Sequence, residues 1–158
     1  MIQVLFVCLG NICRSPLAQA IFNEKISESS LSKKFWADSA GTAAYHVGEA
    51  PDARSRANAK ENGLNYTHSA RQFGVQDFDE FQYIIAMDES NYHNIIRLAE
   101  QHEVQHSHIY LMRKFEGSPS SMEVPDPYYG GPRGFQEVFD ILDRSTEGLI
   151  QQLKAEHL

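Results

Sequence analysis

The feature that most constrains this chain is an apolar run that ends in a cysteine near the N-terminus. Val4–Val7 are four consecutive apolar residues, a pattern typical of a strand buried on both faces. Cys8 follows directly, and Ser15-Pro16 then marks the expected start of a helix, with Ser15 as its N-cap and Pro16 in its first turn. A tight loop, Cys8–Arg14, therefore joins a buried strand to a helix N-terminus.

This loop has the composition of an anion-binding turn. Gly10 and Asn11 tolerate the unusual backbone dihedrals that let several N–H groups converge on one anion, and the helix dipole adds to their effect. Arg14 offers a planar guanidinium that matches two phosphate oxygens. Because Cys8 lies at the mouth of the loop, we expect its thiol to be ionised at neutral pH and to act as a nucleophile. The sequence around the pair favours this interpretation over a buried cysteine and a surface arginine.

These residues carry a resemblance to a known family. The segment C-L-G-N-I-C-R-S-P at 8–16, together with D-P-Y-Y-G at 126–130, resembles the low-molecular-weight protein tyrosine phosphatases. The other matches, in family order, are D-S-A-G-T at 38–42, V-G-E-A-P-D at 47–52, H-S-A-R-Q at 68–72 and M-D-E-S-N at 87–91. The resemblance covers nearly the whole chain, and it implies hydrolysis of protein phosphotyrosine and small aryl phosphates through a phosphocysteine intermediate.

The resemblance also implies roles for particular residues. Cys8 is the expected nucleophile, and Arg14 with the loop N–H groups is the expected phosphate clamp. Asp126, held extended between two prolines, is the expected general acid and base, although by itself it would pass for a solvated loop aspartate. The remaining residues expected around the phosphate are Leu9, Gly10, Asn11, Ile12, Cys13 and Ser15.

Aromatic residues are expected to shape the substrate slot. Tyr128 and Tyr129 lie in a loop rich in Pro and Gly, where no strand or helix pattern requires them, and they are suited to wall a slot for a phenyl ring. By resemblance, Tyr45 forms the opposite wall; the alternative is that it packs against its own loop. Glu49 replaces a basic residue of several relatives and is expected to tune substrate preference.

Supporting residues around the loop are also implied by the resemblance. Asn11 is expected to share one hydrogen-bond network with Ser39 and His68, and Asp88 is expected to orient Arg14. Ser15 is expected to stabilise the thiolate. The other six histidines are interpreted as surface residues.

Strand and helix patterns alternate along the chain. Later strands are expected at 35–39, 83–87 and 109–112, and helices at 52–62, from Asp88 to 101, and over 135–153, with a long loop at 114–133. This order predicts an α/β fold: a four-stranded parallel sheet of order 2-1-3-4 with helices on both faces, a flavodoxin-like three-layer sandwich. Cys8 and Asp88, which follow strands 1 and 3, then meet at the switch point of the sheet.

Composition narrows the class of protein further. With 158 residues, 42% of them hydrophobic, residues 1–158 are expected to form one domain. No apolar run reaches the ~20 residues of a membrane span, and no signal peptide is evident. The two cysteines do not form a secreted disulfide framework, which favours a cytoplasmic protein. The net charge of −7 disfavours nucleic acid as a partner.

The expected partners are proteins or peptides that contain phosphotyrosine, with inorganic phosphate and vanadate as inhibitors. No membrane, metal or cofactor is expected, and the chain is expected to be a monomer or a weak dimer. Two other functions share the loop: a phosphocysteine carrier module and a thioredoxin-coupled arsenate reductase. Arg14 and Asp126 argue against a carrier, and the absence of any cysteine after Cys13 argues against the reductase relay.

Cys13 is not required for phosphate transfer. Cys8 and Cys13 flank a loop that curls around one phosphate, so their side chains are close enough for a disulfide hypothesis. Oxidation of Cys8 would then produce a reversible Cys8–Cys13 disulfide that protects Cys8 from further oxidation. The alternative is that Cys13 is a small packing residue under the loop.

Overall fold

The computed structural model describes the backbone of residues 1–158 and every side chain except that of Tyr129. Its centre is a four-stranded parallel sheet of order β2-β1-β3-β4, which confirms the predicted order. The strands are β1 (Ile2–Cys8), β2 (Phe35–Gly41), β3 (Tyr83–Ala86) and β4 (Ile109–Leu111).

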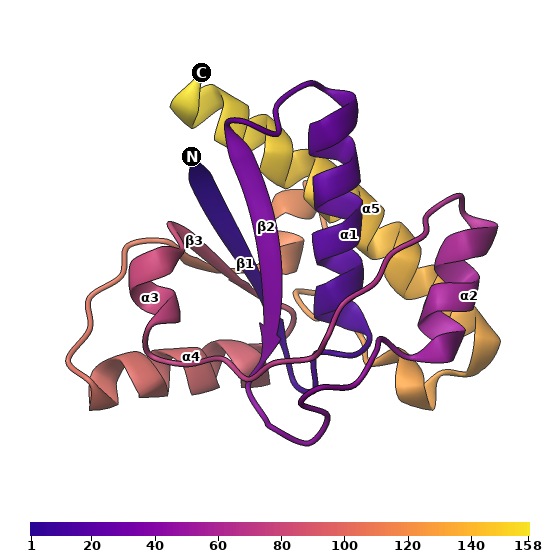
Figure 1. Cartoon of the computed structure of the whole chain (residues 1–158), viewed down its shortest axis with the longest axis horizontal. Coiled ribbons are helices and arrows are strands. Elements are labelled where there is room, and N and C mark those ends of the chain that lie inside the picture. The colour runs from indigo at the N-terminus through magenta and orange to yellow at the C-terminus, as the bar shows by residue number, and fades with distance from the viewer.

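Helices cover both faces of this sheet (Figure 1). They are α1 (Arg14–Glu28), α2 (Ala53–Glu61), α3 (Asp77–Glu80), α4 (Glu89–Gln101) and α5 (Gly131–His157), with two short 3-10 helices, η1 (Met112–Glu116) and η2 (Pro127–Tyr129). Helices α1 and α5 lie on one side of the sheet, α3 and α4 lie on the other, and α2 packs beside α5. Within the part of the chain that the structure describes, no helix is long and apolar enough to cross a membrane.

Strand β1 divides its side chains between two cores. Val4 and Phe6 pack with the apolar faces of α1 and α5, whereas Leu5 and Val7 pack with residues of α3 and α4. All four are fully buried. The continuous apolar run at 4–7 is therefore explained by burial on both faces, as expected of a central parallel strand.

The carboxyl ends of the central strands bring the candidate site together. Cys8 ends β1 and pairs with Gly41 at the end of β2, and Asp88 follows β3 as the N-cap of α4. A Cβ atom on Gly41 would lie 2.7 Å from the carbonyl oxygen of Leu9, so this position admits the loop after β1 only because it is glycine. The site lies at the crevice where the strand order reverses.

Two helix starts differ from the sequence-based expectation. Helix α1 begins at Arg14 with Cys13 as its N-cap, so Ser15 lies inside the first turn and does not cap it. Its hydroxyl instead faces Cys8 and Asn11, which provide stronger local partners than the helix N–H groups. Helix α5 begins at Gly131, within the segment expected to be a loop, because Pro132 fits the first turn of a helix. That segment also contains η2 and part of η1.

Candidate active site

The loop between β1 and α1 wraps around a space at the N-terminus of α1. Asn11 adopts the left-handed conformation with φ of 59°, as its position in a tight turn suggested. Gly10 is not among the glycines with positive φ, so of these two residues only Asn11 adopts the left-handed conformation. Gly10 supplies space instead, because a Cβ atom there would lie 2.9 Å from Cδ2 of His46.

A buried hydrogen-bond network holds Asn11 in this conformation. Its Nδ2 donates to Ser15 Oγ at 2.8 Å and to Ser39 Oγ at 3.0 Å. Its Oδ1 accepts from His68 Nε2 at 2.8 Å and from the backbone N–H of Arg71 at 3.0 Å. Burial is the main factor that lowers the pKa of His68, so this ring is neutral at pH 7 and its Nε2 carries the donated proton. The network fixes the loop before any ligand binds.

Cys8 points from the end of β1 into the space that the loop encloses. Its Sγ accepts the backbone N–H of Asn11 at 3.3 Å and lies 2.9 Å from the hydroxyl of Ser15. Ser15 Oγ accepts from Asn11 Nδ2, and its own hydroxyl has two neighbouring acceptors, this sulfur and the carbonyl oxygen of Ala40 at 3.4 Å. The sulfur of Cys8 therefore faces two hydrogen-bonding groups of the loop.

Arg14 is buried beside this cysteine and is held from two sides. Its Nη1 donates to Asp88 Oδ2 at 2.7 Å and to the carbonyl oxygen of Val124 at 3.0 Å. Burial by itself would lower the pKa of Arg14, but Cys8 and Asp88 outweigh it and raise that pKa. Asp88 thus contacts Arg14 directly, and the carbonyl of Val124 links Arg14 to the segment that carries Asp126.

Cys13 differs from Cys8 in its surroundings. Burial, with the negative charge of Asp52 next in size, raises the pKa of Cys13 to about 12. Its side chain remains a neutral thiol at physiological pH. The two cysteines are free in the structure, and both line the same pocket.

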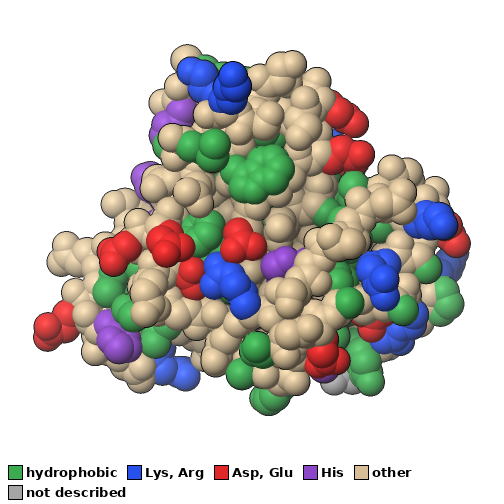
Figure 2. Space-filling model, viewed as in Figure 1, with side chains coloured by type: hydrophobic (Ala, Val, Ile, Leu, Met, Phe, Trp, Pro, Cys, Tyr) green, Lys and Arg blue, Asp and Glu red, His purple; other side chains and the backbone are tan. Residues whose placement is uncertain are grey.

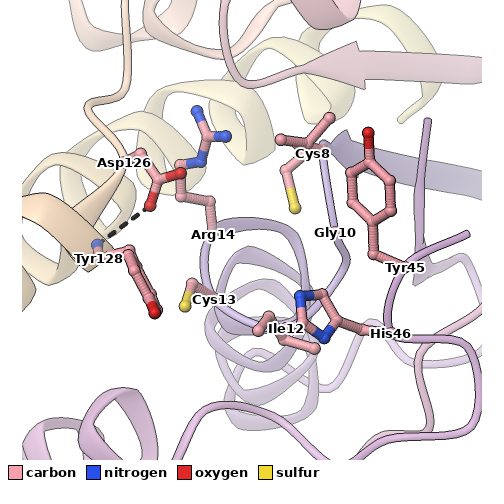
Figure 3. Close-up of a pocket in the computed structure, with 10 residues that line it drawn as sticks. Cys8, Gly10, Ile12, Cys13, Arg14, Tyr45, His46, Asp126 and Tyr128 are labelled. Carbon is pink, nitrogen blue, oxygen red and sulfur yellow. Dashed lines mark hydrogen bonds between the residues drawn. The ribbon is translucent and has the colours of Figure 1, made fainter. Parts of the chain in front are cut away.

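The pocket above the loop has a volume of about 300 Å³ (Figure 3). Its lining residues are Cys8, Leu9, Gly10, Ile12, Cys13, Arg14, Tyr45, His46, Asp126 and Tyr128. In Figure 3, Asp126 and Tyr128 lie on one side, Tyr45 lies on the other, and the sulfur of Cys8 points into the space between them. Tyr45 is 76% exposed and stands at the rim, which contradicts the alternative that it packs against its own loop. The side chain of Tyr129 lies outside the described residues.

Asp126 approaches the pocket from the segment that precedes η2. Its Oδ1 accepts the backbone N–H of Tyr128 at 3.0 Å, which caps η2 and orients the carboxylate. Two residues earlier, the N–H of Val124 donates to the carbonyl oxygen of Met87 at 2.9 Å. The start of this segment is therefore tied to the end of β3, and Asp126 faces the same cavity as Cys8.

Comparison with known proteins identifies the family. The family model for low molecular weight phosphotyrosine protein phosphatase matches residues 3–158. The chain belongs to this family. A low molecular weight phosphotyrosine protein phosphatase of Schizosaccharomyces pombe is 45% identical over 96% of this chain and 97% of its own length.

Solved structures of similar phosphatases have the same fold as this chain. A protein tyrosine phosphatase from Entamoeba histolytica is 42% identical, with a TM-score of 0.91 over 100% of both chains. A Drosophila arginine phosphatase is 35% identical, with a TM-score of 0.90 over 96% of this chain and 97% of that protein.

Some residues of this phosphatase site were not found from the sequence. His46 was interpreted as a surface histidine, but it lines the pocket and its Nδ1 lies 2.7 Å from Oε2 of Glu49. His106 and His108 are partly buried, and each has a hydrogen-bond partner, the carbonyl oxygen of Phe81 and the hydroxyl of Tyr110 respectively. Arg54 contacts the ring of Tyr128. His46 adjoins Tyr45 in the sequence, which was a usable signal, whereas nothing in the local sequence distinguishes Arg54 from a solvated helix charge.

Proposed function

We propose that this chain hydrolyses phosphotyrosine in proteins, and small aryl phosphates, through a phosphocysteine intermediate. The observation that supports it best is the placement of the Cys8 sulfur and the Arg14 guanidinium in one cavity that Tyr45, Asp126 and Tyr128 also line. A nucleophile, a phosphate clamp, a proton donor and aromatic walls are the groups that cleavage of an aryl phosphate needs.

In the first step, the phosphate occupies the space that the loop encloses. The backbone N–H groups at 9–14 bind its oxygens, and Arg14 binds two oxygens through Nε and Nη2, because Nη1 is engaged by Asp88 and Val124. The Cys8 thiolate attacks phosphorus, so that an S–P bond forms while the bond to the tyrosine oxygen breaks. Asp126 gives its proton to that oxygen, and the phenol leaves neutral.

In the second step, water replaces the phenol and Asp126 acts as the base. It takes a proton from the water as the water attacks phosphorus, and the S–P bond breaks with its electron pair returning to Cys8. Ser15, 2.9 Å from the sulfur, stabilises the departing thiolate. Inorganic phosphate leaves, and Asp126 is again protonated for the next cycle.

The aromatic walls favour a long flat substrate. Cys8 is 3% exposed at the base of the cavity, whereas Tyr45 and Tyr128 are 76% and 57% exposed at its rim. A phenyl arm spans this depth and packs between the rings, while the short arm of phosphoserine leaves its phosphate above the sulfur. Phosphate and vanadate, which fit the loop without an arm, are expected to compete.

A substrate panel tests this proposal. We expect kcat/KM for a phosphotyrosine peptide to exceed that for the matched phosphoserine peptide by a factor of roughly 10² or more. The side chain of phosphoserine has no ring to pack against the tyrosines, and it is too short to bring its phosphate to the sulfur of Cys8. The panel includes a phosphoarginine peptide, since one relative at 35% identity is an arginine phosphatase. Equal rates on phosphotyrosine and phosphoserine would contradict the slot, and a preference for phosphoarginine would replace the proposed substrate.

A further inference from the structure

Arg54 is a surface arginine that contacts a carboxylate and two aromatic rings, whereas a fully solvated arginine would contact mainly water. It lies in the first turn of α2, and its side chain is 52% exposed. Its guanidinium carbon lies 5.0 Å from the ring centroid of Tyr128 and 5.0 Å from that of Phe135. Helix α2 also carries Arg56 and Lys60, and Figure 2 shows basic side chains gathered over this helix.

Asp52 fixes the direction of the Arg54 side chain. Its Oδ1 accepts from Arg54 Nε at 3.2 Å, and its Oδ2 accepts from Nη2 at 2.9 Å, so the planar guanidinium is bound at two points. The backbone N–H of Asp52 donates to the carbonyl oxygen of Ile12 at 2.8 Å. Through Asp52, the side chain of Arg54 is therefore connected to the loop between β1 and α1.

On its other side, Arg54 reaches the segment that carries the proposed acid. Tyr128 lies two residues after Asp126, and its N–H donates to the Asp126 carboxylate at 3.0 Å. Phe135 belongs to the first turns of α5, which follow η2 directly. A continuous set of contacts therefore runs from Ile12 through Asp52 and Arg54 to Tyr128, and from there to Asp126.

We propose that Arg54 is a positioning residue for Asp126: braced by Asp52, it holds the Tyr128 ring and so keeps the Asp126 carboxylate over the phosphate. This inference rests on the proposed role of Asp126 as general acid. A guanidinium suits the task because it is planar and weakly hydrated, so that it covers two aromatic faces while its edge binds a carboxylate. An ammonium is a point charge and covers them less well.

Leaving-group dependence separates this role from simple attraction of an anionic substrate. A misplaced acid slows substrates whose phenol needs a proton and spares those whose phenol leaves readily as an anion. For Arg54→Ala we expect kcat/KM to fall by roughly 3- to 10-fold for phenols of high pKa, the size of one or two exposed cation–π contacts, and to change little for dinitrophenyl phosphate. Arg54→Lys should recover part of the loss.

Lys60→Ala is the matched control, because it removes one positive charge from an exposed position of the same helix. It should leave the whole series unchanged. If Arg54→Ala and Lys60→Ala lowered kcat/KM equally for every leaving group, α2 would act as a basic patch and the proposal would be wrong. A uniform loss in Arg54→Ala alone, with a lowered melting temperature, would also overturn it, since that result describes a structural residue.

Combining Arg54→Ala with three further variants shows where the effect arises. Adding Arg54→Ala to Asp126→Asn should cause little additional loss, because positioning has no value once the acid is gone. Adding it to Tyr128→Leu should also have little effect, whereas Tyr128→Phe keeps the ring and should remain sensitive. If Asp126→Asn itself showed no leaving-group dependence, the proposed role of Asp126 as general acid would fail, and the inference about Arg54 with it. If Asp126→Asn showed it and Arg54→Ala did not, only the inference about Arg54 would fail.

Discussion

The loop between β1 and α1, proposed to bind phosphate, and the segment that carries Asp126 face the same cavity but are built in opposite ways. In the loop, Asn11 is 1% exposed and Ser15 is fully buried, and their polar atoms meet one another inside the protein. In the other segment, Tyr128 is 57% exposed and Asp126 is partly exposed. One region is a sealed network, and the other is a surface turn.

This difference follows from what each region is proposed to do. Stabilisation of charge on phosphate requires donors that are already in place, because reorganising them during the reaction would cost free energy. A group that protonates a phenol and then activates water must be reachable by both, so it cannot be sealed. The two regions meet at Val124, whose carbonyl accepts from Arg14 and whose N–H donates to Met87. The fixed region therefore anchors the start of the exposed one.

The largest expected effect is at the nucleophile. Cys8→Ser should abolish turnover of an aryl phosphate, because a serine hydroxyl in this loop is not ionised at pH 7. The bonds from the Asn11 side chain to Ser15, Ser39 and His68 do not involve the sulfur, and a serine hydroxyl can replace the sulfur beside Asn11 N–H and Ser15, so the variant should remain folded and should still bind phosphate. Steady-state kinetics and isothermal titration with phosphate check both halves. More than trace activity would remove Cys8 from its proposed role.

The next effect is at Asp126, in the exposed region. Asp126→Asn should lower kcat by roughly 10²–10⁴-fold on substrates with poor leaving groups, the usual worth of a general acid. Its melting temperature should match that of the wild-type protein, since the carboxylate bonds only locally to Tyr128 N–H among the contacts described above. The measurement is kcat across aryl phosphates of increasing phenol pKa, and a uniform deficit would contradict the assignment.

Unlike Asp126→Asn, which should leave the melting temperature unchanged, Asn11→Ala should lower both stability and activity. The alanine removes the buried amide that bonds to Ser39, His68 and the backbone N–H of Arg71, and it must adopt a left-handed φ that a β-carbon disfavours. We expect the free energy of unfolding to fall by about 1–3 kcal/mol, as for other buried groups that lose their partners. Urea denaturation measures it. An unchanged midpoint would mean that the network does not hold the loop.

The same contrast explains what the sequence predicts well. Cys8, Asn11 and Arg14 lie in one short segment between a strand and a helix, so local pattern and physical chemistry are enough to single them out. Asp126 stands more than a hundred residues away and was found only by resemblance to a family. Arg54 was not found because its contacts with the rings of Tyr128 and Phe135 join distant segments, which no local pattern encodes. The cap of α1 was misplaced because Ser15 has a tertiary partner, the Cys8 sulfur, that outweighs helix capping.

Oxidation should distinguish the two cysteines of the fixed region. Peroxide converts the Cys8 thiolate to a sulfenic acid, and the thiol of Cys13 then displaces water to form a disulfide. The raised pKa of Cys13 keeps it a thiol, so Cys8 is the group oxidised first. After peroxide and then dithiothreitol, wild-type activity should recover almost fully, and Cys13→Ser should recover in part. Equal recovery of the two would assign Cys13 to packing alone.

The smallest expected effect concerns the charge of His68. Burial lowers the pKa of this ring, and Arg71 lowers it further against the opposing effect of Asp38. The folded protein therefore binds its proton less readily than the unfolded chain, whose histidine titrates near 6.5. The stability that the neutral ring contributes is complete above that pH and is lost as the pH falls below it.

His68→Asn isolates this contribution, because the other histidines are present in both proteins. The wild-type protein should be the more stable at pH 7.5, since Nε2 of His68 supplies a buried donor to Asn11. Its advantage in urea midpoint should shrink between pH 7 and pH 5, as protonation of the ring opposes its burial in the network. An advantage that stayed constant would show that folding does not lower the pKa of His68. An advantage that grew toward acid pH would show that the ring is charged when folded. The loop would then be held by an ion and not, as the buried network implies, by neutral hydrogen bonds.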